Sequence, residues 1–299
     1  MMIITKTPYR ISFFGGGSDY PQWYNKYNGL VLSTTIDKHI YISCRFLPSF
    51  FKHKYRIVWS KIENVKKINQ IKHKAVRGLL NHYKIKNGLE IHYDGDLPAR
   101  SGMGSSSTFT VGLTKALLEI KKHKLSSLNI AKKAIDFEQN IMGEAVGSQD
   151  QIAASLGGFN KISFKKNNKF TVSKIKKTKR VKKLENNLIL IYSGIQRTAQ
   201  YIASSYIQKL TRSKKKYIEK IVKFVDDGFD IINGGDLDDF GRLLHESWLL
   251  KKKLSSNITN KKINNLYNYA IENGALGGKL LGAGGGGFLL MYMKKKYRK

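Results

Sequence analysis

Glycine is concentrated in three short segments of this 299-residue chain. The segments are residues 15–17, 102–104 and 282–287, and they hold a disproportionate share of the 27 glycines. Because glycine destabilises helices and strands, such clusters mark tight turns or places where the backbone comes close to a ligand. These three segments are therefore the first candidates for turns or for a binding site.

Apolar patterning around these segments predicts an α+β fold. Helical spacing or β-rich composition defines each expected element. The expected strands are residues 3–7, 30–36, 40–46, 55–59, 89–93, 159–164, 170–175, 188–192, 276–281 and 287–293. The expected helices are residues 105–122, 128–142, 150–156, 198–209, 214–233, 237–250 and 261–273. The Lys- and Asn-rich stretch 165–187 is interpreted as exposed hairpins or a linker, so we divide the chain into lobes of residues 1–170 and 171–299.

The charge balance is strongly basic, with 54 Lys and Arg against 21 Asp and Glu and a net charge of +33. Such an excess suits nucleic acid, an anionic membrane or phosphorylated small molecules. The alternative is compositional drift at tolerant surface sites, and basic runs at 174–183, 214–216, 251–253 and 294–299 favour it. Carboxylates are scarce, so an acid in an apolar or glycine-rich setting stands out.

Composition excludes several classes of protein. A content of 41% hydrophobic residues excludes a disordered chain. The single cysteine, Cys44, excludes an internal disulfide framework and a thiolate zinc site. No apolar run approaches the roughly 20 residues of a membrane helix, and the N-terminus lacks the apolar core of a signal peptide. We expect a cytoplasmic protein, and a homodimer stays open.

The middle glycine segment directly precedes a strongly predicted helix. It reads Leu97-Pro98-Ala99-Arg100-Ser101-Gly102-Met103-Gly104-Ser105-Ser106-Ser107. A glycine-rich loop that opens a helix offers free N–H groups and the positive end of the helix dipole, and both favour phosphate. It is neither a Walker A loop nor a dinucleotide fingerprint. Phosphate binding and a structural capped helix are both open on this evidence.

Three acidic residues stand apart from the basic surface. Arg10 and Asp19 lie on either side of an apolar strand and the first glycine turn. Glu138 and Asp150 enclose a segment of small, amide and apolar residues. Each has a structural alternative, because Asp19 would suit a hairpin turn and Asp150 a helix N-cap.

Taken in order, these segments resemble the motifs of the GHMP kinase superfamily, which includes galactokinase, homoserine kinase and mevalonate kinase. The first motif, P-x-[RK] followed by a glycine turn and an acid, matches Pro8-Tyr9-Arg10 and residues 15–19. The second, P-x-x-x-G-[LI]-G-S-S-[AS], matches Pro98 to Ser107, with Met103 replacing the usual Leu. The third, K-x-x-G-A-G-x-G-G, matches Lys279 to Gly287.

The resemblance implies a two-lobed GHMP kinase-like fold, with ATP and a sugar between the lobes. The N-terminal lobe would be like domain 2 of ribosomal protein S5, and the C-terminal lobe would be ferredoxin-like. Residues 15–19 (GGGSD) and 147–151 (GSQDQ) further resemble heptose-phosphate and fucose kinases. The implied reaction is ATP-dependent phosphorylation of the anomeric hydroxyl of a heptose 7-phosphate. A fucokinase or hexosamine 1-kinase activity is the alternative.

The family's residue roles carry over to the matching positions. Asp150 matches the general base, and Arg10 matches the cation that would hold it ionised. Ser106 and Glu138 match the Mg²⁺ ligands. The ATP-binding residues implied are Pro98, Gly102, Met103, Gly104, Ser105, Ser106 and Ser107. The substrate-binding residues implied are Gly16, Gly17, Ser18, Asp19, Gly284 and Gly285.

Two assignments have alternatives. The interval from Glu138 to Asp150 is one residue longer than in the pattern of the mevalonate kinases, so Glu144 is the alternative metal ligand. The phosphate that the sugar carries needs a cation that no motif identifies. We assign Arg197, which precedes a predicted helix, and a solvated arginine is the alternative.

A nucleic-acid-binding module is the competing hypothesis from another class of protein. It would use the S5-like lobe and predicts binding that weakens steeply with salt, but it does not account for the glycine and aspartate segments. A catalytically silent regulator is disfavoured by the presence of Arg10, Ser106, Glu138 and Asp150 together. The sequence therefore predicts ATP, Mg²⁺ and a sugar phosphate as partners, with no nucleic acid and no membrane insertion.

Overall fold

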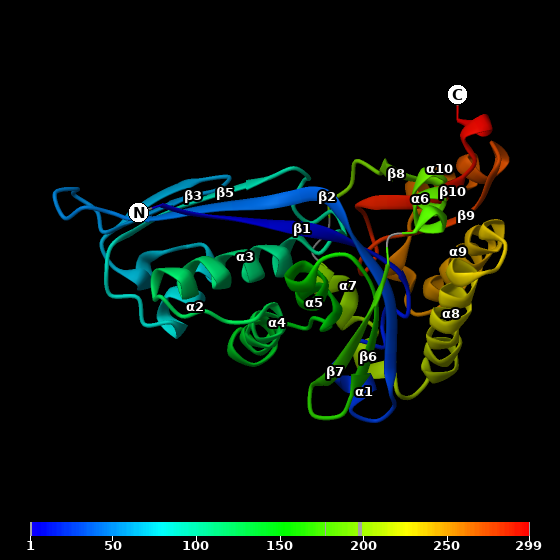
Figure 1. Ribbon diagram of the computed structural model, residues 1–299, viewed down its shortest axis with the longest axis horizontal. Coiled ribbons are helices and arrows are strands. Elements are labelled where there is room, and N and C mark those ends of the chain that lie inside the picture. The colour runs from blue at the N-terminus through cyan, green and yellow to red at the C-terminus, as the bar shows by residue number, and fades with distance from the viewer. Residues whose placement is uncertain (1, 177, 197–198, 299) are drawn as a thin grey trace.

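Two β-sheets and the helices packed on them make up the fold of the computed structural model, which describes residues 2–176, 178–196 and 199–298 (Figure 1). The first sheet has the strand order β4-β3-β5-β2-β6-β7, and β1 pairs with β2. Its strands are β1 Met2–Phe14, β2 Gly29–Phe46, β3 Tyr55–Val58, β4 Ile62–Val65, β5 Leu89–Gly95, β6 Phe159–Lys165 and β7 Lys169–Ile175. All pairs are antiparallel except β3 with β5.

Helices of the N-terminal lobe cover one face of this sheet, as Figure 1 shows for α2, α3 and α4. The helices are α1 Pro21–Tyr24, α2 Lys74–His82, α3 Ser105–Ile120, α4 Ser127–Asp136 and α5 Gln149–Leu156. A π-helical turn, η2, continues α4 over Phe137–Ile141, and a 3₁₀ turn, η1, spans Ile68–Gln70. The side chains of Leu113 and Leu117 on α3 are fully buried, which fixes α3 against the sheet.

The second sheet has the antiparallel order β8-β10-β9. Its strands are β8 Leu188–Tyr192, β9 Ala275–Leu280 and β10 Phe288–Met293. The helices of this lobe are α6 Lys179–Asn186, α7 Ala199–Ser204, α8 Lys215–Asn233, α9 Leu237–Lys252 and α10 Lys261–Glu272. Short 3₁₀ turns lie at η3 Ile207–Lys209, η4 Ser256–Ile258 and η5 Lys295–Tyr297.

The two lobes share one apolar core. Phe13 and Phe14, at the end of β1, pack against Phe240 of α9 with ring centroids 5.3 and 5.0 Å apart. Gly228 of α8 lies against the same end of β1, because an added Cβ would come 2.6 Å from the Phe14 ring. Since apolar burial is the main favourable term in folding, this contact fixes how the lobes meet.

Local patterning merged or missed several elements, including the short helix α1. The expected strands at 30–36 and 40–46 are one continuous strand, β2, because β1 pairs with both parts of it. Strand β4 and helix α2 lie in a region left without elements, and α6 lies inside the stretch interpreted as hairpins or a linker. Helix α6 forms because Leu184 is buried while its lysines stay in solvent. The expected lobe boundary at residue 170 falls inside β7, so the first sheet continues to Ile175.

A search of the described residues for a membrane-spanning helix found no segment with the length and apolar character that crossing requires.

Candidate active site

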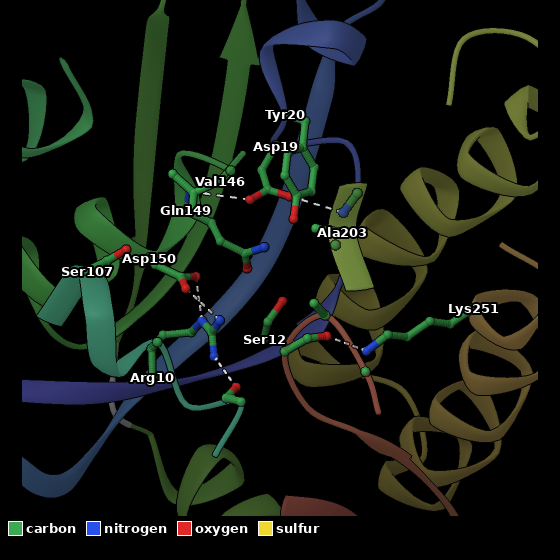
Figure 2. A pocket seen from close by; sticks show the side chains of 18 of the residues that line it. Arg10, Ser12, Asp19, Tyr20, Ser107, Val146, Gln149, Asp150, Ala203 and Lys251 are labelled. Carbon is green, nitrogen blue, oxygen red and sulfur yellow. Dashed lines mark hydrogen bonds and ion pairs between the residues drawn. The ribbon is translucent and has the colours of Figure 1, made fainter. Parts of the chain in front are cut away.

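A cavity of about 360 Å³ opens between the two lobes and collects the predicted motifs. From the N-terminal lobe it is lined by the end of β1, the glycine turn after it, the start of α3 and the segment leading into α5. From the C-terminal lobe it is lined by residues of α7, α8 and α9 and by the third glycine segment. Figure 2 shows Arg10 and Asp150 facing each other across one side, with Asp19 and Lys251 on other sides.

Arg10 and Asp150 form a bidentate ion pair at the cavity wall. Arg10 Nε donates to Asp150 Oδ1 at 2.7 Å, and Nη2 donates to Oδ2 at 2.8 Å. Arg10 Nη1 donates to the Gly102 carbonyl at 2.8 Å, so the guanidinium also holds the middle glycine segment. Two parallel bonds orient a carboxylate firmly. Each Asp150 oxygen keeps a free lone pair, which a substrate hydroxyl could use.

Asp19 is buried beneath the first glycine turn. The Gly17 N–H donates to Asp19 Oδ1 at 3.0 Å. Burial and, to a lesser degree, the nearby Asp150 raise the pKa of Asp19. Only glycine fits at position 147, because an added Cβ would come 1.9 Å from Asp19 Oδ2. The Gly17 N–H and the close backbone at Gly147 therefore fix the carboxyl group of Asp19 at the cavity wall.

The middle glycine segment presents the start of α3 to the cavity. Gly102 and Gly104 have φ angles of 80° and 77°, a conformation that favours glycine. Gly104 is the N-cap of α3 and offers no side chain, so the first N–H groups of the helix are not capped by it. Ser105, Ser106 and Ser107 all line the cavity. Free N–H groups and the helix dipole make this an anion-binding position.

The third glycine segment packs backbone to backbone on the middle one. An added Cβ at Gly102 would come 2.6 Å from the Leu281 carbonyl oxygen, and one at Gly287 would come 2.1 Å from that of Ser101. The Phe288 N–H donates to the Ser101 carbonyl at 3.1 Å. The glycines are needed because side chains would separate these two segments.

Glu138 lies behind the cavity wall instead of on it. Ser107 Oγ donates to Glu138 Oε2 at 2.7 Å, and Gln151 donates to the same oxygen. Among the described residues Glu138 Oε1 has no hydrogen-bond partner. Burial raises the pKa of Glu138 to about 7. Glu144, the alternative ligand, lines the cavity.

Glu138 lies in a π-helical turn, η2, which begins the interval that leads through Glu144 to Asp150. Met142 N donates to the Phe137 carbonyl at 2.8 Å, an i→i+5 bond. A π turn holds one residue more than an α turn. Part of the interval from Glu138 to Asp150 is therefore taken up by this wider turn.

Most of the predicted site residues line the cavity, and five described ones do not. Pro98, Glu138 and Gly285 lie outside its lining. Met103 is fully buried in the core. Ser18 Oγ is taken up by the Gly15 and Leu30 carbonyls, both at 2.8 Å, so it fixes the turn. Arg197 lies outside the described residues. The ligand roles of all these residues stay predictions.

The C-terminal lobe contributes cavity residues that sequence reasoning missed. Lys251, Tyr206 and Ser247 line the cavity from helical or turn segments that carry no motif. Lys251 belongs to the basic run 251–253, which was interpreted as surface drift. Tyr20 and Lys279 also line the cavity. Tyr20 directly follows Asp19 and Lys279 begins the third motif, so the motifs themselves could have identified these two residues as candidates.

Comparisons with known proteins identify the family to which the chain belongs. The family model described as the GHMP kinases N terminal domain matches residues 69–158, and that described as GHMP kinases C terminal matches residues 217–298. The chain belongs to the GHMP kinases. It is an ATP-dependent sugar kinase, with the two-lobed α+β fold of that family.

Individual relatives narrow the comparison. The chain is 33% identical to a D-glycero-alpha-D-manno-heptose 7-phosphate kinase of Campylobacter jejuni, over 99% of this chain and 91% of the relative. A solved structure described as a D-glycero-D-manno-heptose 1-phosphate kinase of Bacteroides thetaiotaomicron is 25% identical, with a TM-score of 0.79 over 99% of this chain and 89% of that one. The mevalonate kinase of Methanococcus jannaschii, at 23% identity and a TM-score of 0.73 over 99% and 92%, shares the fold.

Proposed function

We propose that this kinase transfers the γ-phosphoryl group of ATP to the anomeric hydroxyl of D-glycero-D-manno-heptose 7-phosphate and forms the 1,7-bisphosphate. The Campylobacter relative, described as a heptose 7-phosphate kinase, supports this choice of substrate. The observation that carries the chemistry is the Arg10–Asp150 ion pair, which lies in the same cavity as the start of α3. This pair supports the proposal, because Asp150 could act as the base with the guanidinium of Arg10 beside the transferred phosphoryl group.

Asp150 is the proposed general base. It would take the proton of the anomeric hydroxyl as the hydroxyl oxygen attacks the γ-phosphorus and the bond to the ADP oxygen breaks. Arg10 keeps the carboxylate oriented through its two bonds and adds a positive charge next to the transferred group. Phosphoryl transfer depends mainly on such positioning and charge neutralisation. Asp19 would accept a hydrogen bond from another sugar hydroxyl.

The start of α3 is the proposed seat of the triphosphate. Ser105, Ser106 and Ser107 all line the cavity, and the hydroxyl of Ser107 donates to Glu138. They would bind phosphate oxygens through the helix dipole and direct hydrogen bonds. Gly284 would approach the same ligands from the third segment, because it too lines the cavity.

The donor set near Ser107 fits a magnesium ion. A hydroxyl and a carboxylate are hard oxygen ligands, and Glu138 Oε1 is a buried acceptor without a partner among the described residues. Ser106 and Glu138 would hold the ion, with Glu144 as the alternative carboxylate on the wall. When bound, Mg²⁺ would neutralise charge on the phosphates.

The product would be a sugar with an anomeric phosphate. Such a phosphate is the form that a nucleotidyltransferase activates, so we place the reaction before the formation of a nucleotide-activated heptose for surface polysaccharide. We also propose that the protein is cytoplasmic and that its partners are two small molecules, ATP and the sugar phosphate. The kinase comparisons support it over a nucleic-acid-binding module.

Turnover measurements test the proposal. ADP release with ATP and Mg²⁺ is measured for D-glycero-D-manno-heptose 7-phosphate, L-fucose, galactose and an N-acetylhexosamine, and ³¹P NMR locates the new phosphate. The heptose 7-phosphate should give the highest kcat/KM. Asp150→Asn should lower kcat by ~10²-fold or more, because removal of a general base has at least this effect.

The control is Asp94→Asn, which removes an exposed carboxylate at the end of β5, outside the cavity lining. This variant should keep the kinetic constants of the wild type. The substrate assignment is wrong if another sugar is preferred, and the mechanism is wrong if Asp150→Asn keeps the wild-type kcat.

A further inference from the structure

The cavity holds more positive charge than the proposed chemistry uses. Arg10, Arg100, Lys251 and Lys279 all line it. The guanidinium of Arg10 is paired with Asp150. The two lysines have no carboxylate within ion-pair distance in the part of the chain that the structure describes. The side-chain nitrogens of these two lysines therefore lack a carboxylate partner among the described residues.

Lys251 differs from Lys279 in how its ammonium is held. Lys279 is buried and donates to the Phe13 carbonyl at 2.6 Å, where it ties the third segment to β1. Lys251 of α9 points toward the third glycine segment (Figure 2). It donates to the carbonyls of Leu280 at 2.8 Å and Gly282 at 2.5 Å. A protonated lysine has three N–H donors, so in that form one donor of Lys251 has no partner among the described residues and is free for a ligand.

The surroundings of Lys251 favour an anion at that position. Gly282 packs on Gly102, whose carbonyl accepts from Arg10, so three cations gather around the two glycine segments. Burial, and then the neighbouring Lys279 and Arg10, lower the pKa of Lys251 well below its usual value. Carbonyl oxygens do not compensate a desolvated positive charge as an oxyanion does. A phosphate oxygen would supply both the charge and the acceptor.

We propose that Lys251 is a phosphate-binding residue of this cavity, which receives an oxyanion of a phosphoryl group on its free N–H donor. The phosphoryl group has two sources, the phosphate that the sugar carries and the γ-phosphoryl of ATP. This inference rests on the proposed function, because it requires a phosphorylated substrate in the cavity. It gives the sugar phosphate or the transferred group a cation within the described residues.

Two variants separate the charge of Lys251 from its structural bonds. Lys251→Gln keeps amide N–H donors for the carbonyls of Leu280 and Gly282 and removes the charge, whereas Lys251→Arg keeps the charge. Hydrogen bonds to charged groups predict that Lys251→Gln loses about 10- to 100-fold in the affected constant. Lys251→Arg should lose much less. Lys253→Gln, on the same basic run but exposed, is the matched control.

The kinetic constants identify which phosphate is bound. They are measured for ATP, for D-glycero-D-manno-heptose 7-phosphate and for the same heptose without phosphate. A raised KM for the heptose 7-phosphate alone, with the unphosphorylated heptose unaffected, assigns Lys251 to the sugar's phosphate. An equal fall in kcat with both sugars, at unchanged KM, assigns it to the transferred group.

Several results would overturn the inference. One is a Lys251→Gln enzyme with wild-type constants for all three ligands. Another is a Lys251→Arg enzyme that loses as much as Lys251→Gln, because the charge would then not matter. If Lys251→Gln does not fold, Lys251→Met, which also removes the charge, takes its place, with the same expected losses. Wild-type constants of that variant for all three ligands would overturn the inference. Wild-type turnover is measured first, so failure of the proposed function is seen separately.

Discussion

At the scale of single residues, three carboxylates in one region have three different environments. Asp150 is oriented by a guanidinium, Asp19 is held by backbone N–H groups, and Glu138 is buried against a hydroxyl and an amide. The charge of a carboxylate is stabilised by hydrogen bonds and positive neighbours and destabilised by burial. Their environments therefore suit different tasks, a difference that their residue types alone do not show.

Glu138 should make stability depend on pH. Its pKa is about 7 in the folded chain and near 4.5 when unfolded. As pH rises from 4.5 to 7, the unfolded state loses this proton while the folded state retains it, so stability falls across that window. Glu138→Gln removes this dependence, and the stability of the variant relative to the wild type should rise by about 3 kcal/mol at most between pH 4.5 and pH 8.

Urea unfolding of both proteins across that pH range, without Mg²⁺ or nucleotide, measures the difference. Asp136→Asn, at an exposed acid on α4, controls for the general effect of removing a carboxylate. Parallel pH curves for the wild type and Glu138→Gln would show that the folded chain holds Glu138 ionised.

At the scale of elements, the glycine segments allow close backbone packing against each other as well as room for a ligand. The middle and third segments touch through their backbones, so their glycines are required by packing. Local patterning could predict that α3 begins near residue 105, because the loop and the apolar spacing are both local signals. It did not predict α6, since this helix is short and lysine-rich and has one buried residue, Leu184.

The contact between these segments should make Gly287→Ala strongly destabilising. Gly287 has a φ of 100°, and a Cβ there would come 2.1 Å from the Ser101 carbonyl oxygen. The left-handed conformation costs about 1–2 kcal/mol and the collision adds about 1–3 kcal/mol. The KM for ATP should also rise, because the middle segment would be displaced.

Gly143→Ala is the matched control for this prediction. Gly143 also has a positive φ, 63°, but nothing lies within 4 Å of an added Cβ. It should therefore show the conformational cost alone. Equal losses of stability in thermal or urea unfolding of the two variants would mean that the contact between the segments contributes nothing.

At the scale of the whole molecule, the net charge of +33 has a physical consequence apart from any partner. Charges of one sign repel each other in a compact state, and salt screens this repulsion within a Debye length of about 10 Å at 0.1 M. The described residues include few ion pairs that would lose stability in salt. Screening of the repulsion should therefore outweigh the loss of these ion pairs, so the stability of the folded chain should increase when salt is added.

Thermal unfolding should therefore shift upward with salt. We expect Tm to rise by roughly several degrees between 50 and 500 mM NaCl, since a change of about 1 kcal/mol moves Tm by a few degrees in a chain of this size. Sodium and potassium chloride should act alike, because the effect is screening. A Tm that falls with salt would show that attractive pairs outweigh the repulsion.

The sequence by itself determined the motifs and the α+β class, because these depend on local backbone preferences and on side-chain chemistry. Its resemblance to the GHMP kinases implied the Arg10–Asp150 pair. Only the tertiary structure decided which segments meet. Lys251, Tyr206 and Ser247 reach the cavity from a lobe without motifs on those helices, and Glu138 lies behind the wall while Glu144 lines it. These outcomes come from packing between elements distant along the chain, through the core shared by Phe13, Phe14 and Phe240. No local pattern records such packing.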